Sequence, residues 1–165
     1  NINFGEDCKQ KNRTWHNISR WIYAMLNTTK EKPAKYTELN CFTIKNNEYL
    51  QKMAVVNIKK SNGTSLTKSK NLKFYLKKDK DLLAQQIALI KPTIIVCGYT
   101  LSSLKVIFPE LNEHNKELKE NHSARIKIND NDVLVLDCYH PSNWIYSNKQ
   151  LFDMLVEVYQ KALLE

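Results

Sequence analysis

Two patterns of apolar residues alternate along the chain. Apolar residues at helical spacing predict helices, and short apolar runs rich in β-branched residues predict buried strands. The predicted helices cover about residues 15–27, 76–91, 101–107 and 148–164. The predicted strands cover about residues 53–58, 93–97, 124–128 and 133–136, the last two flanking a polar hairpin turn. The polar stretch 109–123 is predicted to be irregular.

This alternation predicts an α/β fold. We expect a single domain over residues 1–165, built as a three-layer αβα sandwich. Helices would cover both faces of a mostly parallel sheet of roughly four strands. In such sheets ligands bind beyond the carboxyl ends of the strands. Three residues stand at predicted strand ends, namely Asn57, Gly98 and His140.

Asn57 and His140 carry side chains with useful chemistry at these ends. The carboxamide of Asn57 offers one acceptor and two donors, which can read the edge of a nucleobase or simply cap the following loop. Pro141 holds His140 in an extended conformation. An imidazole at this place can donate to a developing oxyanion, or it can be an ordinary loop histidine.

The charge of the chain points to a polyanionic partner. The chain has 25 Lys and Arg against 17 Asp and Glu, a formal net charge of +8. Residues 59–80 hold eight Lys and a single acid, Asp79. Such a surface favours nucleic acid. Lys and Asn together make up 40 of the 165 residues, however, which is also typical of a coding bias toward AT-rich codons.

Several classes of protein are excluded by the sequence. No apolar run approaches the roughly 18 residues of a membrane span, and no N-terminal stretch resembles a signal peptide. The four cysteines lack metal-site spacing, and the three glycines form no phosphate loop. Cys97 and Cys138 end apolar runs and are predicted to be buried thiols. We expect a cytoplasmic, intracellular protein with no metal, cofactor or membrane partner.

Two motifs and their order resemble the uracil-DNA glycosylase superfamily. Val-Val-Asn at residues 55–57 is similar to the family's base-reading Asn motif, and residues 140–142 are similar to its His-Pro-Ser motif. A helix–Pro–strand–Gly segment at residues 90–98 lies between them, as in the family. The resemblance implies that Asn57 reads the target base and that His140 stabilises the base as it leaves.

Further positions are implied by the same resemblance. Trp144, four residues after the His, matches an apolar residue that wedges into the minor groove, although it can also pack on the last helix. Phe4 precedes a family-like helix start at residues 14–18, and would either stack on the flipped base or be a core residue. The remaining implied substrate-binding residues are Gly98, Tyr99, Pro141 and Ser142.

One motif of the family has no clear counterpart. Gly-x-Asp-Pro-Tyr ends the family's central strand and supplies the water-activating group, but residues 5–7 lack the Pro and the Tyr. The water-activating carboxylate is then either Asp7 or a residue upstream of Asn1. We expect either that the chain is truncated at its N-terminus, or that residues 1–4 or another segment replace the strand.

Together these residues predict a DNA glycosylase. The enzyme would flip a uracil or a related modified base out of single- or double-stranded DNA and hydrolyse its N-glycosidic bond without a cofactor. Contacts to phosphates are assigned to Lys59, Lys60 and Lys68. The alternatives are a nucleic-acid-binding module that has lost the chemistry, a glycosylase for a modified base other than uracil, and a protein-interaction domain whose lysines are only solvated.

Overall fold

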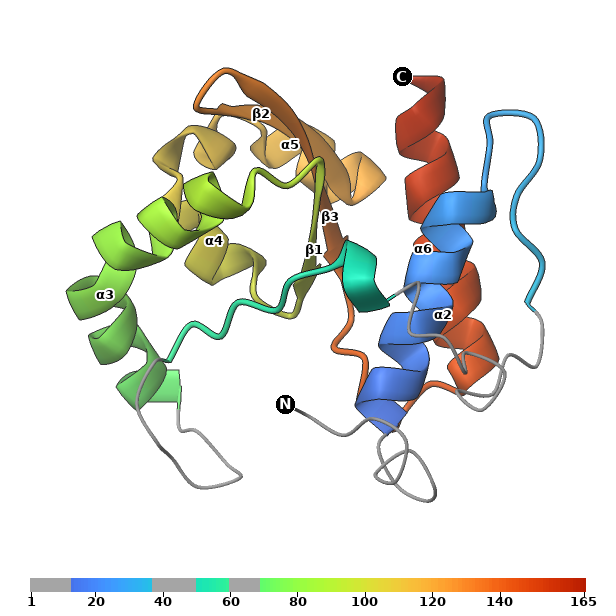
Figure 1. Ribbon diagram of the computed structural model, residues 1–165, viewed down its shortest axis with the longest axis horizontal. Helices are drawn as coiled ribbons and strands as arrows, with labels where there is room; N and C mark the ends of the chain where they lie inside the picture. The colour runs from blue at the N-terminus through green and yellow to red at the C-terminus, as the bar shows by residue number, and fades with distance from the viewer. Residues whose placement is uncertain (1–12, 37–49, 60–68) are drawn as a thin grey trace. The chain divides into compact units, whose positions relative to one another are not determined.

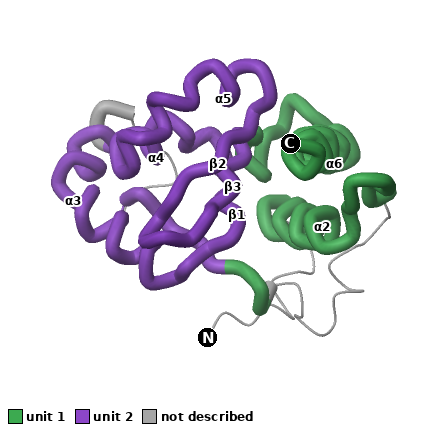
Figure 2. Tube along the Cα trace, turned by 90° about the horizontal axis from the view of Figure 1, so that it is seen from above, with its two compact units in different colours: residues 1–53, 138–165 green, residues 54–137 purple. Residues whose placement is uncertain are grey.

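The computed structural model of the chain describes residues 13–36, 50–59 and 69–165 (Figure 1). These residues form two compact units (Figure 2). Unit 1 contains the described residues 13–36, 50–53 and 138–165. Unit 2 contains the described residues 54–59 and 69–137.

Unit 2 is built around a mixed sheet, which has three strands in the part of the chain that the structure describes. Its elements are α3 (Ser69–Ile90), β1 (Ile94–Gly98), α4 (Leu101–Ile107), η2 (Pro109–Asn112), α5 (Asn115–Asn121), β2 (Ser123–Ile128) and β3 (Asn131–Cys138). The strand order is β1-β3-β2. Strands β2 and β3 are antiparallel, with Ile128 opposite Asn131. On the other edge of β3, the Leu134 N–H donates to the Thr93 carbonyl at 3.0 Å.

Asn129 and Asp130 form the turn between β2 and β3. Both residues have positive φ angles, 46° and 65°. Short polar side chains tolerate this left-handed region, and two such residues in succession favour the tight turn of a hairpin. The predicted hairpin is therefore confirmed, and both of its strands extend beyond their predicted bounds.

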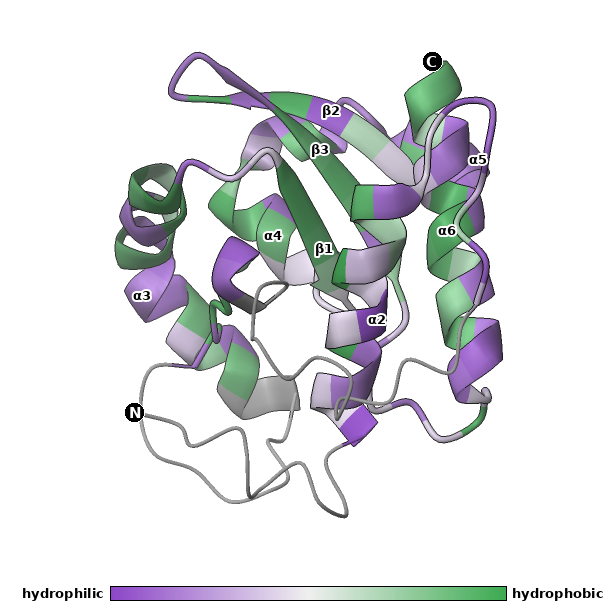
Figure 3. Ribbon diagram, turned by 45° about the vertical axis from the view of Figure 1, so that its right-hand side comes forward, coloured by the Kyte–Doolittle hydropathy of each residue, from purple (hydrophilic) through white to green (hydrophobic). Residues whose placement is uncertain are grey.

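The core of unit 2 is an apolar cluster formed by side chains of the sheet and of the surrounding helices. Its buried members are Ile87, Cys97, Leu104, Phe108, Leu111, Leu118, Ala124, Ile126, Ile128, Val133 and Val135. Residues 133–136 of β3 are all buried, as is typical of a central strand covered on both faces. Figure 3 shows the same pattern as a hydrophobic colour along β1 and β3.

Unit 1 is a pair of packed helices with a short 3₁₀ turn. Its elements are α2 (Arg13–Asn27), η1 (Leu50–Lys52) and α6 (Asn148–Leu164). Helices α2 and α6 pack against each other. Trp21 of α2 is buried, and its indole N–H donates to the Leu151 carbonyl of α6 at 3.2 Å. The two helices predicted at the ends of the chain are therefore confirmed.

The α/β class is confirmed, but the strand predicted at residues 53–58 is wrong. The structure gives this segment no strand, and the sheet is mixed rather than mostly parallel. Ala54 and Val55 are exposed, whereas Val56 packs against the core of unit 2. A strand requires a neighbouring backbone to complete its ladder of hydrogen bonds. Within the described residues, this segment forms no ladder with the sheet, so its β-branched composition is not sufficient.

Two other local predictions are also corrected. The stretch predicted as irregular contains η2 and α5, because Leu111 and Leu118 are buried and supply apolar anchors in an otherwise polar sequence. Helix α3 begins at Ser69 rather than near Leu76. Its first two turns include Lys70 and Lys73, a residue type with good helix propensity, and contain no Gly or Pro to end the helix.

Candidate active site

Directly after β3 the chain forms a tight turn at His140. The Asn143 N–H donates to the His140 carbonyl at 2.8 Å and closes the turn. The imidazole folds back onto the same residues: its Nδ1 lies 2.6 Å from the Ser142 hydroxyl and accepts from the Ser142 N–H at 3.1 Å. Residues 140–143 are called the His140 turn below. The structure thus brings the three members of the His-Pro-Ser motif together.

These hydrogen bonds determine the protonation of His140. A backbone N–H can only donate, so Nδ1 must present a lone pair to Ser142. Partial burial lowers the pKa of His140 below its ordinary value of 6.5, which favours the neutral ring at pH 7. The single ring proton then resides on Nε2. His140 is therefore a neutral hydrogen-bond donor, a group suited to stabilising an oxyanion.

Helix α2 anchors the His140 turn. Asn17 is buried, and its Nδ2 donates to the Pro141 carbonyl at 2.7 Å. Arg20, one helical turn further on, donates to Asn17 Oδ1 at 3.0 Å and so orients the amide. Sequence reasoning assigned no role to Asn17. The feature that points to it is an Asn inside an amphipathic helix, where this residue is unfavourable without a partner.

Two apolar side chains beyond the turn are open to solvent. Trp144 is 84% exposed and Ile145 is 69% exposed. The alternative in which Trp144 packs on the last helix is therefore wrong. Beside them the rings of Tyr139 and Tyr146 lie 4.8 Å apart between centroids, and their hydroxyls are 3.3 Å apart. Large exposed apolar groups grouped on one segment are typical of a binding surface.

The other described candidates belong to unit 2. Asn57 is exposed in the segment without regular structure. Gly98 ends β1 as predicted, and Tyr99 follows it with a φ of 66° and 71% exposure. A positive φ is uncommon for a bulky residue. Lys59 lies with its Nζ 5.0 Å from the centroid of the Tyr75 ring.

Cys97, just before Gly98, is a packing residue. It is 1% exposed, and burial, assisted by the charge of Asp137, raises its pKa to about 12. The thiol is therefore protonated at neutral pH and is not a nucleophile. The prediction of a buried thiol is confirmed for Cys97, whereas Cys138 is half-buried.

Four predicted site residues lie outside the described residues, namely Phe4, Asp7, Lys60 and Lys68. Over residues 13–36, 50–59 and 69–165, no group of three or more His, Cys, Asp or Glu side chains is placed to hold a metal ion. None of the helices in these ranges is both long and apolar enough to cross a membrane.

Comparisons of the chain with protein-family models, with curated proteins and with solved structures found no match.

Proposed function

We propose that the protein is a DNA glycosylase of the uracil-DNA glycosylase type, which flips a uracil or a related modified base from DNA and hydrolyses its N-glycosidic bond. The observation that carries the proposal is the neutral imidazole of His140, held by Ser142 with its proton on Nε2. The family's three-layer αβα sandwich belongs to the same proposal. So does an intracellular location.

In this proposal His140 acts on the leaving base. The bond between the sugar C1′ and the base nitrogen breaks, and its electron pair leaves with the base, so negative charge develops on a base oxygen. The Nε2–H of His140 donates to that oxygen and stabilises the anion. A neutral donor is well matched to this step, because it costs no reorganisation when the charge appears.

Water completes the reaction. Its oxygen forms the new bond to C1′, and its proton passes to a carboxylate, for which Asp7 is the candidate in this sequence. The negative charge of the DNA phosphates stabilises the positive charge that develops on the sugar. None of these steps requires a metal or an organic cofactor.

The remaining candidates select and hold the substrate. Asn57 reads the edge of the flipped base, and its exposed carboxamide is available for this contact. Trp144 fills the gap that the flipped base leaves, for which an exposed indole is suited. In this scheme Phe4 stacks on the base, and the other proposed substrate-binding residues are Gly98, Tyr99, Pro141 and Ser142. The proposed phosphate contacts are Lys59, Lys60 and Lys68.

The test is base excision from a uracil-containing oligonucleotide. We expect His140→Ala to lower the rate by about 10²- to 10³-fold, as removal of one oxyanion donor does elsewhere. Asn57→Ala should also lose excision. His114→Ala, which removes a half-buried imidazole from unit 2, is the matched control and should retain the wild-type rate. Full activity in both site variants would refute the proposal.

The same assay separates the alternatives. Binding to DNA that weakens steeply with salt, without any abasic product, would indicate a nucleic-acid-binding module that lacks the chemistry. Excision of another lesion from a panel of modified oligonucleotides, but not of uracil, would keep the reaction and change the substrate.

A further inference from the structure

Helix α3 presents a basic surface around one exposed aromatic ring. Phe74 is 66% exposed, and Lys73, Lys77 and Lys78 are exposed beside it. On a helix, residues three and four positions apart are neighbours, so Lys77 and Lys78 flank Phe74 on the same face. These four residues are called the Phe74 surface below. An exposed aromatic ring among cations is a different feature from a uniformly charged helix face.

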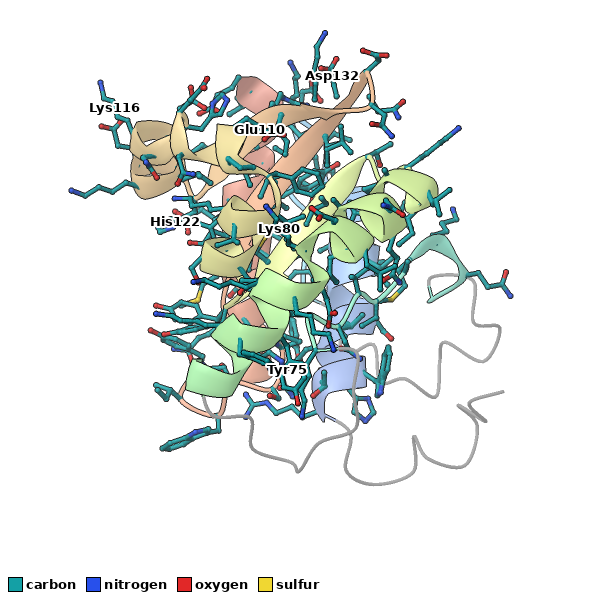
Figure 4. The ribbon with its side chains drawn as sticks, turned by 90° about the vertical axis from the view of Figure 1, so that its left-hand side faces the viewer. Tyr75, Lys80, Glu110, Lys116, His122 and Asp132 are labelled. Atoms are coloured by element: carbon teal, nitrogen blue, oxygen red, sulfur yellow. The ribbon has the colours of Figure 1, made fainter. Side chains whose placement is uncertain are left out.

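The ring at the centre of this surface has an ordered neighbour. Phe74 meets Tyr75 edge to face, with centroids 5.6 Å apart. Tyr75 is half-buried, and the ammonium of Lys59 lies 5.0 Å from its ring centroid. Figure 4 views the molecule with α3 toward the reader and labels Tyr75 and Lys80 on it. The Tyr75 contact limits the movement of the Phe74 ring. Less side-chain conformational entropy is therefore lost when a ligand stacks on that ring.

The lysines of the surface are not neutralised by the described protein. Among the described residues, none of Lys73, Lys77 and Lys78 takes part in an ion pair. The sequence from Ser69 to Lys78 contains no acid; the first acids on α3 are Asp79 and Asp81. The local field is therefore positive around the ring, and it favours a polyanion.

We propose that the Phe74 surface binds a single strand of nucleic acid, with Phe74 stacking on an unpaired base and Lys73, Lys77 and Lys78 contacting the flanking phosphates. Aromatic platforms within basic surfaces bind single strands in this way without reading sequence, because every base has a π-face. In a duplex the bases are stacked on each other, so the ring gains little. This inference does not rest on glycosylase chemistry.

A protein partner is the competing occupant of this helix. Leu82 and Leu89 are exposed further along α3, at 56% and 82%. Single exposed apolar residues are common, however, and these two have fewer lysines around them. The combination of positive charge with an aromatic ring occurs only in the N-terminal half of the helix, and it favours the nucleic acid.

The first experiment measures fluorescence anisotropy of a labelled oligothymidine strand and of a duplex of equal length. We expect the wild-type protein to prefer the single strand. Phe74→Ala should weaken binding by roughly 5- to 100-fold, the usual effect of removing a stacking platform. Phe74→Trp should retain it. Leu89→Ala, which truncates a still more exposed side chain on the same helix, should bind like wild type.

The second experiment tests the phosphate contacts. The double variant Lys77→Gln, Lys78→Gln should lower the slope of log affinity against log salt by about 1.4 for a single strand. The control is Lys116→Gln, Lys119→Gln on α5, which removes the same charge from two other exposed lysines of unit 2. Circular dichroism verifies that each variant is folded.

Three outcomes would overturn the inference. They are an equal loss in both double-lysine variants, a preference of the wild-type protein for the duplex, and wild-type affinity in Phe74→Ala. Self-association that depends on Phe74 and Leu89, with no effect on oligonucleotide binding, would assign the surface to a protein partner instead. These binding measurements do not depend on base excision, and the excision assay of His140→Ala does not depend on Phe74. Either proposal can therefore fail while the other stands.

Discussion

The two units bury polar groups to different extents. In unit 2 the core cluster is apolar, and the buried polar side chains among its described residues are Ser103 and Ser123. In unit 1 a single helix and the residue after it bury Asn17, Ser19, Arg20 and Thr28. Unit 1 therefore depends more on directional hydrogen bonds, and unit 2 depends more on apolar packing.

This difference agrees with the proposed role of each unit, the Phe74 surface in unit 2 and the His140 turn in unit 1. Apolar packing is strong but does not orient groups, and it supports the helix that carries the exposed Phe74 surface. A hydrogen bond specifies direction as well as distance. The bond from Asn17 to the Pro141 carbonyl fixes the backbone of the His140 turn, and the two contacts from Ser142 fix the ring. An imidazole that must point at one atom requires directional hydrogen bonds rather than apolar packing alone.

The largest effect is expected from a cavity in the core of unit 2. Leu111 is 0% exposed within the apolar cluster, so Leu111→Ala should lower the free energy of unfolding by about 2–5 kcal/mol. Leu82→Ala, at an exposed position, should change it by less than about 0.5 kcal/mol. Urea unfolding measures both variants. Similar values for the two leucines would mean that apolar burial does not stabilise this unit.

The next effect sharpens the role of the polar contacts in unit 1. Asn17→Ala removes the donor to Pro141 and the acceptor for Arg20, and should cost about 1–3 kcal/mol of stability in urea unfolding. Asn17→Asp retains the acceptor but loses the donor. In both variants the nitrogen chemical shifts of the His140 ring should move, because the turn loses its anchor. Unchanged shifts would show that Asn17 stabilises the helix without positioning the turn.

The same contrast explains what could be predicted from the sequence. Helix α6 and the hairpin were predicted closely, because their apolar periodicity and their turn and capping residues agree with each other. The strand predicted around Val55 failed, since a strand depends on a partner that composition does not reveal. The His-Pro-Ser motif located the turn. Its anchor, Asn17, is more than 120 positions away in sequence and was not predicted.

A smaller loss is expected at the start of α6. The Ser147 hydroxyl accepts from the Gln150 N–H, and the Gln150 side chain accepts from the Ser147 N–H, which forms a capping box. Ser147→Ala should therefore cost about 1 kcal/mol of stability. Ser102→Ala on α4, at an exposed position of unit 2, is the control and should have little effect. Thermal unfolding that does not distinguish the two serines would contradict this account of the cap.

The smallest effect is in the pH dependence of stability, where His140 of unit 1 and Asp137 of unit 2 should act with opposite sign. Burial lowers the pKa of His140 below 6.5, so the unfolded chain takes up this proton first as the pH falls. The contribution of His140 to stability is therefore present above about pH 6.5 and is lost as the pH falls toward the lowered pKa. His16 has a pKa lowered by burial and by Arg20, and shifts stability in the same direction.

Asp137 of unit 2 should act in the opposite sense. Burial raises the pKa of its carboxyl above 3.8, and the charges of His122 and Lys105 only partly oppose this. The folded state then retains a proton that the unfolded chain has already released, so stability falls as the pH rises from about 3.8 through the raised pKa. Urea unfolding measures both effects. In wild type, stability should fall below pH 6.5, and His140→Gln should reduce that fall. Stability should also fall as the pH rises above 3.8, and Asp137→Asn should reduce that fall. Because His16 is unchanged in both variants, it cancels when each is compared with wild type. Differences of the same sign for the two variants would contradict burial as the common cause, because loss of the charged form shifts an imidazole and a carboxyl in opposite directions.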